Sequence, residues 1–199
     1  MQRAVEVGRT EADERDVEPV EHPQGAFDVG VTQHEAGHAT LRLAALLGAE
    51  PVLLRAPGVL ATPELRAAVL RDAHVERALR MLDQLDVAFI GIGPADFHGP
   101  LHEGDNFFSG DQLAQVRAAG AVGQLNQRFV DARGDALPTP LDELVVAITL
   151  EQLRTAGTRV VVAGGTSKWA PLHAALRGRW ADVLVTDLAS ARYLISHAD

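Results

Sequence analysis

The segment RVVVAGGTSK, residues 159–168, decides the fold class of this chain. Three consecutive valines and Ala163 precede two glycines, and a helical pattern of apolar residues then runs from Ser167 to Leu176. This pattern predicts a buried strand that turns directly into a helix. A strand at residues 183–186 and a helix at residues 188–196 repeat the order. The alternation predicts an α/β fold, a three-layer Rossmann-like architecture with a mostly parallel sheet.

A similar apolar run occurs nearer the start of the chain. Residues 87–93, VAFIGIG, are continuously apolar and end in glycines, which is typical of a parallel strand covered by helices. Residues 1–28 are largely charged, so we expect a tail there and one domain over residues 29–199. We also expect helices at residues 33–47, 63–71, 75–82, 111–119 and 150–156, and further strands at residues 52–56, 121–131 and 144–148.

Composition narrows the functional classes. Hydrophobic residues make up 47% of the 199 residues, which is enough for a sizeable core. The formal net charge of −9 disfavours direct nucleic-acid binding by this chain, because such binding rests on a basic surface. Without cysteines the chain has no disulfides and no thiolate chemistry. No apolar run is long enough to span a bilayer or resembles a signal peptide, so we expect a cytoplasmic protein.

The single lysine of the chain, Lys168, marks the first candidate site. It lies in the first turn of a predicted helix, directly after Gly164 and Gly165 at the end of a predicted strand. Glycines allow backbone N–H groups to approach an anion, and a helix N-terminus adds free donors beside the lysine charge. The spacing excludes a P-loop. We predict a phosphate site here; the alternative is a tight turn with a solvated lysine.

A second pattern, His34-Glu35-Ala36-Gly37-His38, matches the H-E-x-x-H motif of zinc hydrolases. On a helix both imidazoles share one face, and the glutamate can act as a general base toward metal-bound water. No third ligand is evident, although Glu50 or Glu64 could supply one. The alternative is a polar helix start whose histidines face solvent or a pocket.

Three further segments admit simpler interpretations. We expect Gln124 on a strand with polar positions, and the carboxylates of residues 139–143 in an exposed acidic turn. Asp187 is expected to cap the helix that follows it.

Taken in order, these segments resemble the effector-binding domain of SorC/DeoR-type sugar-responsive transcriptional regulators. The resemblance covers roughly residues 33–195. It is carried by residues 56–58 (APG), 62–66 (TPELR), 86–93 (DVAFIGIG), 120–123 (GAVG), 128–131 (RFVD), 139–143 (TPLDE), 163–165 (AGG) with Lys168, and 182–187 (DVLVTD).

This resemblance implies a fold similar to sugar-phosphate isomerases and deaminases, and a domain that binds a phosphorylated sugar without chemistry, cofactor or metal. It implies that Lys168 contacts the phosphate together with the Gly164 and Gly165 amides. Gln124 stands where the family usually carries a sugar-facing Asp or Glu. Gln33 and His34 are further candidates beside the cleft. The resemblance also implies a homo-oligomer whose assembly changes when the effector binds.

The chain departs from the family pattern in several places. No N-terminal DNA-binding module is recognisable, so any DNA contact would need a separate module. The first half of the effector domain is missing or replaced by residues 1–28, so we expect the fold to be incomplete on its N-terminal side. Leu144 stands where an Arg is common. The H-E-x-x-H pattern falls near the effector cleft, where its histidines could face a sugar. A zinc-dependent hydrolase using His34, Glu35 and His38 remains the alternative function.

Overall fold

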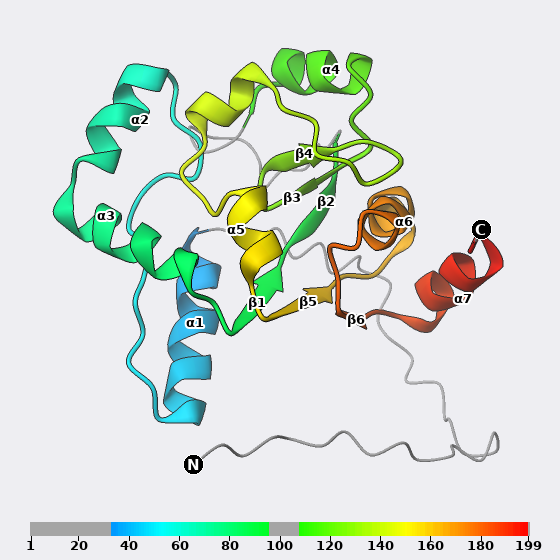
Figure 1. Ribbon diagram of the computed structural model, residues 1–199, viewed down its shortest axis with the longest axis horizontal. Helices are drawn as coiled ribbons and strands as arrows, with labels where there is room; N and C mark the ends of the chain where they lie inside the picture. Colours follow the sequence, from blue (N-terminus) through cyan, green and yellow to red (C-terminus); the bar gives the residue numbers. More distant parts are fainter. Residues whose placement is uncertain (1–32, 96–107, 199) are drawn as a thin grey trace.

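The structure is a computed structural model that describes residues 33–95 and 108–198, with side chains from Thr40 onward in the first range. In these ranges the chain forms a mixed α/β fold with one parallel and one antiparallel sheet, each of three strands (Figure 1). The expected tail and part of the loop after residue 95 lie outside the described residues.

The parallel sheet has β5 (Thr158–Val162) at its centre, between β1 (Val87–Ile90) and β6 (Val183–Val185). Ile90 pairs with Val161, which in turn pairs with Leu184. The α/β class predicted from the sequence is confirmed. Helix α5 (Leu150–Thr155) precedes β5, while α6 (Trp169–Arg177) follows β5 and α7 (Leu188–Ser196) follows β6.

The antiparallel sheet consists of β2 (Ile92–Pro94), β3 (Gly123–Leu125) and β4 (Arg128–Val130). The sequence predicted one strand over residues 87–93, but Gly91 divides that run between the two sheets. The N–H of Gly91 donates to Asn126 Oδ1 over 3.0 Å, and its carbonyl accepts the N–H of Asn126 over 3.1 Å. The chain therefore leaves β1 and enters a different sheet within one residue.

The predicted strand over residues 121–131 is likewise two strands, β3 and β4, joined as a hairpin. Its turn residues, Asn126 and Gln127, have φ angles of 47° and 68°. A two-residue turn with positive φ at both positions twists in the same sense as the two strands that it joins. In the sequence, the polar pair Asn126-Gln127 between two more apolar runs indicates this turn.

The remaining helices follow the sequence expectations closely. Thr62 caps α2 (Pro63–Leu70) by accepting the N–H of Leu65 over 3.3 Å. The other helices are α1 (Gln33–Leu47), α3 (Ala73–Arg80) and α4 (Gly110–Ala118), with 3₁₀ turns η1 (Met81–Asp83), η3 (Pro140–Leu144) and η4 (Thr166–Lys168).

Two predicted strands are wrong. Residues 52–56 form no strand, and Leu54 instead packs on a small cluster around Val75 and Val146. Residues 144–148 begin at the end of η3, and only Val145 makes an isolated bridge, to Val59. Both segments are apolar because they connect packed elements, and an apolar run does not distinguish a buried connector from a strand.

The main core lies on one face of the parallel sheet, where α5, α6 and α7 cover it. Val161, Leu153, Leu172 and Trp180 are each at most 1% exposed in this cluster. A second cluster, around Phe129, fills the space between the antiparallel sheet, α4 and η3. Together these cores fix the ends of β5 and β6, where the candidate site lies.

The hairpin turn generates a stability prediction. Gln127 holds a left-handed φ that costs a residue with a Cβ about 1 kcal/mol or more. We expect Gln127→Gly to raise the free energy of unfolding by about 0.5–1 kcal/mol in urea denaturation, since glycine's larger unfolded-state entropy offsets part of the relief. Gln127→Ala keeps the Cβ and is the control, so an equal gain in both variants would contradict this explanation.

Candidate functional site

The carboxyl ends of β5 and β6 are joined by the side chain of Asp187. Its Oδ2 accepts the N–H of Gly165 and the hydroxyl of Ser190, each over 2.7 Å, and its Oδ1 accepts the N–H of Ser190 over 2.8 Å. Ser190 is fully buried and also accepts the indole N–H of Trp169 over 3.0 Å. The predicted cap of α7 is confirmed, and the same carboxylate ties the start of α7 to the segment before α6.

The two glycines are required by this arrangement. A Cβ on Gly164 would lie 2.4 Å from Asp187 Oδ2, and Gly165 has a φ of +94°. Only glycine meets both conditions without displacing the carboxylate or straining the backbone. Gly164 and Gly165 therefore act first by shaping the turn between β5 and η4.

The carboxyl of Asp187 has a pKa below its usual range, chiefly because the N–H of Ser190 donates to it. Burial acts in the opposite direction, while the Ser190 hydroxyl and the N–H of Gly165 add to the lowering. Asp187 is thus ionised near neutral pH and acts as a permanent acceptor.

Lys168 ends η4 and is half-buried. Among the described residues no carboxylate lies within 4.0 Å of its ammonium group. Its own N–H donates to the carbonyl of Gly165 over 3.0 Å, whereas the N–H groups of Thr166 and Ser167 have no acceptor in the described ranges. One unpaired cation and two open N–H donors therefore gather at this turn, which is a suitable arrangement for an anion.

Gln124 lies on β3, in the antiparallel sheet that neighbours this turn through β2. A Cβ on Gly123 would meet Pro171 of α6 at 2.5 Å. Because side chains alternate along a strand, Gln124 lies on the face of the antiparallel sheet away from α6. Its Nε2 donates to the carbonyl of Pro94 over 3.4 Å. Since η4 also borders β2, Lys168 and Gln124 share a neighbouring strand, but no direct contact joins them.

The other predicted site residues, Gln33 and His34, lie in the first turn of α1, and their side chains are outside the described residues. The same holds for Glu35 and His38 of the H-E-x-x-H pattern. Within the part of the chain that the structure describes, no group of three or more His, Cys, Asp and Glu could hold a metal ion.

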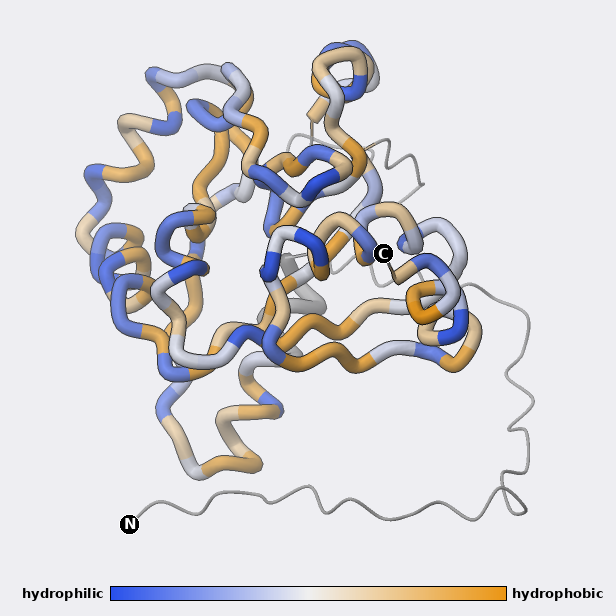
Figure 2. The backbone as a smooth tube through the Cα atoms, turned by 45° about the vertical axis from the view of Figure 1, so that its right-hand side comes forward, coloured by the Kyte–Doolittle hydropathy of each residue, from blue (hydrophilic) through white to orange (hydrophobic). Residues whose placement is uncertain are grey.

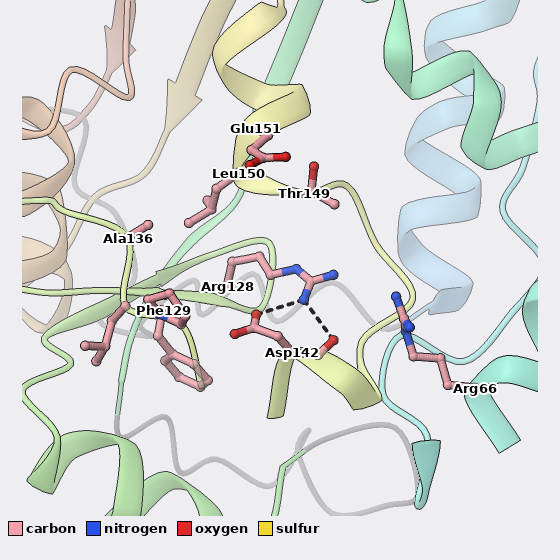
Figure 3. A pocket seen from close by; sticks show the side chains of 10 residues that line it. Arg66, Arg128, Phe129, Ala136, Asp142, Thr149, Leu150 and Glu151 are labelled. Atoms are coloured by element: carbon pink, nitrogen blue, oxygen red, sulfur yellow. Dashed lines mark hydrogen bonds and ion pairs between the residues drawn. The ribbon is translucent and has the colours of Figure 1, made fainter. Parts of the chain in front are cut away.

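A cavity of about 410 Å³ lies between the hairpin, η3 and the start of α5 (Figure 3). Arg128, only 6% exposed, donates through one nitrogen to the carbonyl oxygen and the carboxylate of Asp142, over 3.0 and 2.8 Å. Arg66 faces the cavity from α2 and donates to the carbonyl of Val145 over 2.7 Å. Burial lowers the pKa of Arg66, and the charge of Arg128 acts in the same direction.

Asp142 therefore departs from the expected exposed acidic turn, although the adjacent Glu143 is exposed. Asp142 accepts from Arg128 and from the N–H of Thr139, over 2.7 Å, so it stabilises the hairpin against η3. Sequence reasoning missed this pair because no local pattern links an arginine on a strand to an aspartate on a later turn.

Comparison with known proteins decides the family. A family model described as "Putative sugar-binding domain" matches residues 10–196, nearly the whole chain. The chain belongs to this sugar-binding domain family. The resemblance to SorC/DeoR-type regulators that the sequence indicated is thereby confirmed.

Curated relatives of this sugar-binding domain are transcriptional regulators. The deoxyribonucleoside regulator of Bacillus subtilis (strain 168) is 30% identical over 146 residues, which are 73% of this chain and 46% of that protein. The sorbitol operon regulator of Klebsiella pneumoniae is 29% identical over 177 residues, 87% of this chain and 54% of that protein. The chain thus spans about half the length of these relatives.

Solved structures agree on the fold. The full-length sorbitol operon regulator SorC from Klebsiella pneumoniae superimposes with a TM-score of 0.73 at 28% identity, over 80% of this chain and 51% of that one. A regulator domain from Arthrobacter aurescens TC1, described as sugar-binding, gives 0.71 at 27% identity, over 82% and 63%. The described helices of this sugar-binding domain include none long and apolar enough to cross a membrane.

The link between the two strand ends generates the second prediction. Asp187→Ala removes the cap of α7 and leaves the N–H of Gly165 and the buried Ser190 with fewer partners. We expect a loss of about 2 kcal/mol in the free energy of unfolding, measured by urea denaturation. Asp135→Ala, at an exposed carboxylate, should change it by less than about 0.5 kcal/mol.

The carboxylate of Asp187 should also affect the pH dependence of the free energy of unfolding. Because its folded pKa is lowered, the stabilisation is present above the unfolded pKa of about 3.9 and is lost as the pH falls through the lower folded value. As the pH is lowered below about 4, the free energy of unfolding of Asp187→Ala should therefore fall less steeply than that of the wild type. Parallel acid profiles for the two proteins would refute this assignment.

The Arg128–Asp142 pair generates the third prediction. Asp142→Ala leaves the buried guanidinium group of Arg128 without its carboxylate partner. We expect the free energy of unfolding to fall by about 2–3 kcal/mol, which is less than for a fully buried pair because Asp142 is partly exposed. Glu143→Ala, one residue away and exposed, is the matched control and should have little effect in the same denaturation experiment. Equal effects of the two variants would argue against the pair.

Proposed function

We propose that this chain is a regulatory effector domain that binds a phosphorylated sugar and does not transform it. Membership of the sugar-binding domain family supports binding of a sugar as the activity. The observation that carries the choice of a phosphorylated ligand is Lys168, which pairs with no carboxylate among the described residues. It lies beside two N–H donors that are open in the same ranges, at the end of the central strand. Ligands of parallel α/β sheets bind beyond the carboxyl ends of the strands.

The contacts of Asp187 refine the proposed phosphate site. Gly165 donates its N–H to a carboxylate, and that negative charge disfavours a phosphate at the same amide. We therefore place the phosphate on Lys168 and the N–H groups of Thr166 and Ser167, with Gly164 and Gly165 as the residues that permit the turn. A full positive charge and two backbone donors are a typical set for one phosphate.

The remaining candidates belong to the sugar end of the ligand. Gln124, Gln33 and His34 carry groups that can hydrogen-bond hydroxyls, and Gln124 already borders β2, the strand next to η4. An amide in place of a carboxylate presents a donor as well as an acceptor to the sugar.

The proposal also covers the oligomeric state of the protein and its relation to DNA. We propose a homo-oligomeric cytoplasmic protein whose effect on DNA is exerted through a separate DNA-binding module. The net charge of −9 supports the absence of a direct DNA contact by this chain.

Thermal denaturation with ligands tests the phosphate site. Wild-type protein is screened with sugar phosphates and with the corresponding free sugars at millimolar concentration. A ligand present at 100 times its Kd stabilises by about 2.7 kcal/mol, which for a chain of this size raises Tm by roughly 5–10 °C. We expect this shift for a sugar phosphate, a smaller one for the free sugar, and at least a tenfold weaker Kd in Lys168→Ala.

Arg77→Ala is the control, because Arg77 is an exposed cation on α3, away from the strand ends. It should bind the sugar phosphate like wild type. If no sugar phosphate shifts the wild type, or if Lys168→Ala responds equally, the proposed site is wrong. A response to free sugars alone would retain the sugar-binding activity and refute the phosphate contact.

A further inference from the structure

The cavity between the hairpin, η3 and α5 shares no lining residue with the turn between β5 and η4 (Figure 3). Its volume of about 410 Å³ lies within the range of small-molecule sites. The strands of the parallel sheet are largely hydrophobic, whereas the segments around the cavity mix hydrophilic and hydrophobic residues (Figure 2). The apolar part of the lining consists of Phe129, Ala136, Leu137, Pro138 and Leu150.

Arg128 is buried at the cavity wall and is only partly satisfied. Its Nη1 donates to the carbonyl oxygen and the carboxylate of Asp142, over 3.0 and 2.8 Å. Its Nε is shielded from water and has no acceptor in residues 33–95 and 108–198, and its Nη2 makes no hydrogen bond in the same ranges. Because buried N–H groups without acceptors are costly, an acceptor for this guanidinium group is expected in the cavity.

Arg66 lies opposite Arg128 and reaches the cavity from α2 (Figure 3). Its Nε donates to the carbonyl of Val145 over 2.7 Å, which fixes the direction of its guanidinium group. Burial lowers the pKa of Arg66, and the nearby charge of Arg128 acts in the same direction. Two cations therefore face the same space, and an anion between them would relieve their repulsion.

The charges around the cavity favour a ligand with one negative charge. Arg128 is paired with Asp142, whereas Arg66 has no carboxylate within 4.0 Å among the side chains that the structure describes. Asp142 and the exposed Glu151 also line the cavity, and their charges disfavour a dianion such as phosphate. A carboxylate carries a single charge and two oxygens that match the N–H groups of a guanidinium.

We propose that this cavity binds a small organic carboxylate, whose charged end lies between Arg66 and Arg128 and whose apolar part contacts Phe129 and its apolar neighbours. Asp142 of η3 and Val145 directly after η3 supply the acceptors that orient the two guanidinium groups. The charged end of the site is therefore pre-organised, which reduces the entropy lost on binding.

NMR titration of the full ¹⁵N-labelled chain tests this proposal, with benzoate and hexanoate as probes up to about 20 mM. We expect shifts of the amide signals of residues 128–130, 136–142 and 149–151, with a Kd on the order of 1 mM. Benzamide lacks the charge and acetate lacks the apolar part, so each should bind at least tenfold more weakly than benzoate. Phenyl phosphate, a dianion with the same ring, should also bind more weakly.

Four variants separate charge from shape. Arg66→Gln removes the unpaired charge and should weaken benzoate binding at least tenfold. Glu151→Gln removes a negative charge from the rim and should strengthen binding about twofold. Ala136→Phe fills the cavity while both arginines remain, so it should abolish binding. Arg77→Gln makes the same change as the first variant at an exposed cation on α3, outside the cavity lining, and should bind like wild type.

The proposal is overturned if no carboxylate shifts the wild-type signals, or if benzamide or phenyl phosphate binds as tightly as benzoate. Full affinity in Arg66→Gln would also overturn it. Lys168→Ala should bind benzoate like wild type, and a loss of binding there would place the carboxylate at the turn between β5 and η4 instead. Dispersed amide signals show that each variant is folded, and Glu151→Gln tests the charge requirement at an exposed side chain.

Discussion

The hydrogen bonds that β5 makes to a parallel strand on each side hold distant parts of the chain in one arrangement. Through them Ile90, Val161 and Leu184 form a continuous row, although long connections separate them in the sequence. The same pairing fixes where β5 and β6 end, and therefore brings Gly165 within hydrogen-bond distance of Asp187. The core under α5–α7 depends on this pairing. The turn proposed to bind an anion depends on it too, because the pairing positions the strand ends on both sides of that turn.

Asp187 shows how one residue limits what the turn can bind. Its carboxylate caps α7, accepts from Gly165 and keeps the buried Ser190 satisfied, so its place at the strand ends is structural. In the proposed site the ligand anion uses donors that the carboxylate leaves free, which are the N–H groups of Thr166 and Ser167 and the ammonium group of Lys168. The proposed position of the phosphate thus follows from the negative charge of Asp187 beside the site as much as from the positive charge of Lys168 in it.

Much of the fold was predictable because its signals are local. The helices from α2 onward, β5, β6 and the cap at Thr62 follow from periodicity and capping residues within a few positions. The failures share a cause: Val145 and Val146 belong to different packed clusters, and Gly91 moves the chain between two sheets. An apolar residue reports that it will be buried, but not which neighbour will bury it, so a connector between clusters resembles a strand in the sequence.

The sequence by itself determined the α/β class and the glycines and lysine at the end of the central strand, because each depends on residues close together in the chain. It also determined the family, because the order and spacing of short motifs along the chain carry the resemblance. Only the tertiary structure decided that Gly165 donates to Asp187, that Gln124 lies on the face away from α6, and that Arg128 is buried against Asp142. It alone also placed Phe89, Val162 and Val185, each more than half exposed, on one face of the parallel sheet. These are relations between residues far apart in sequence, and pairing register and packing, which no local pattern records, set their distances.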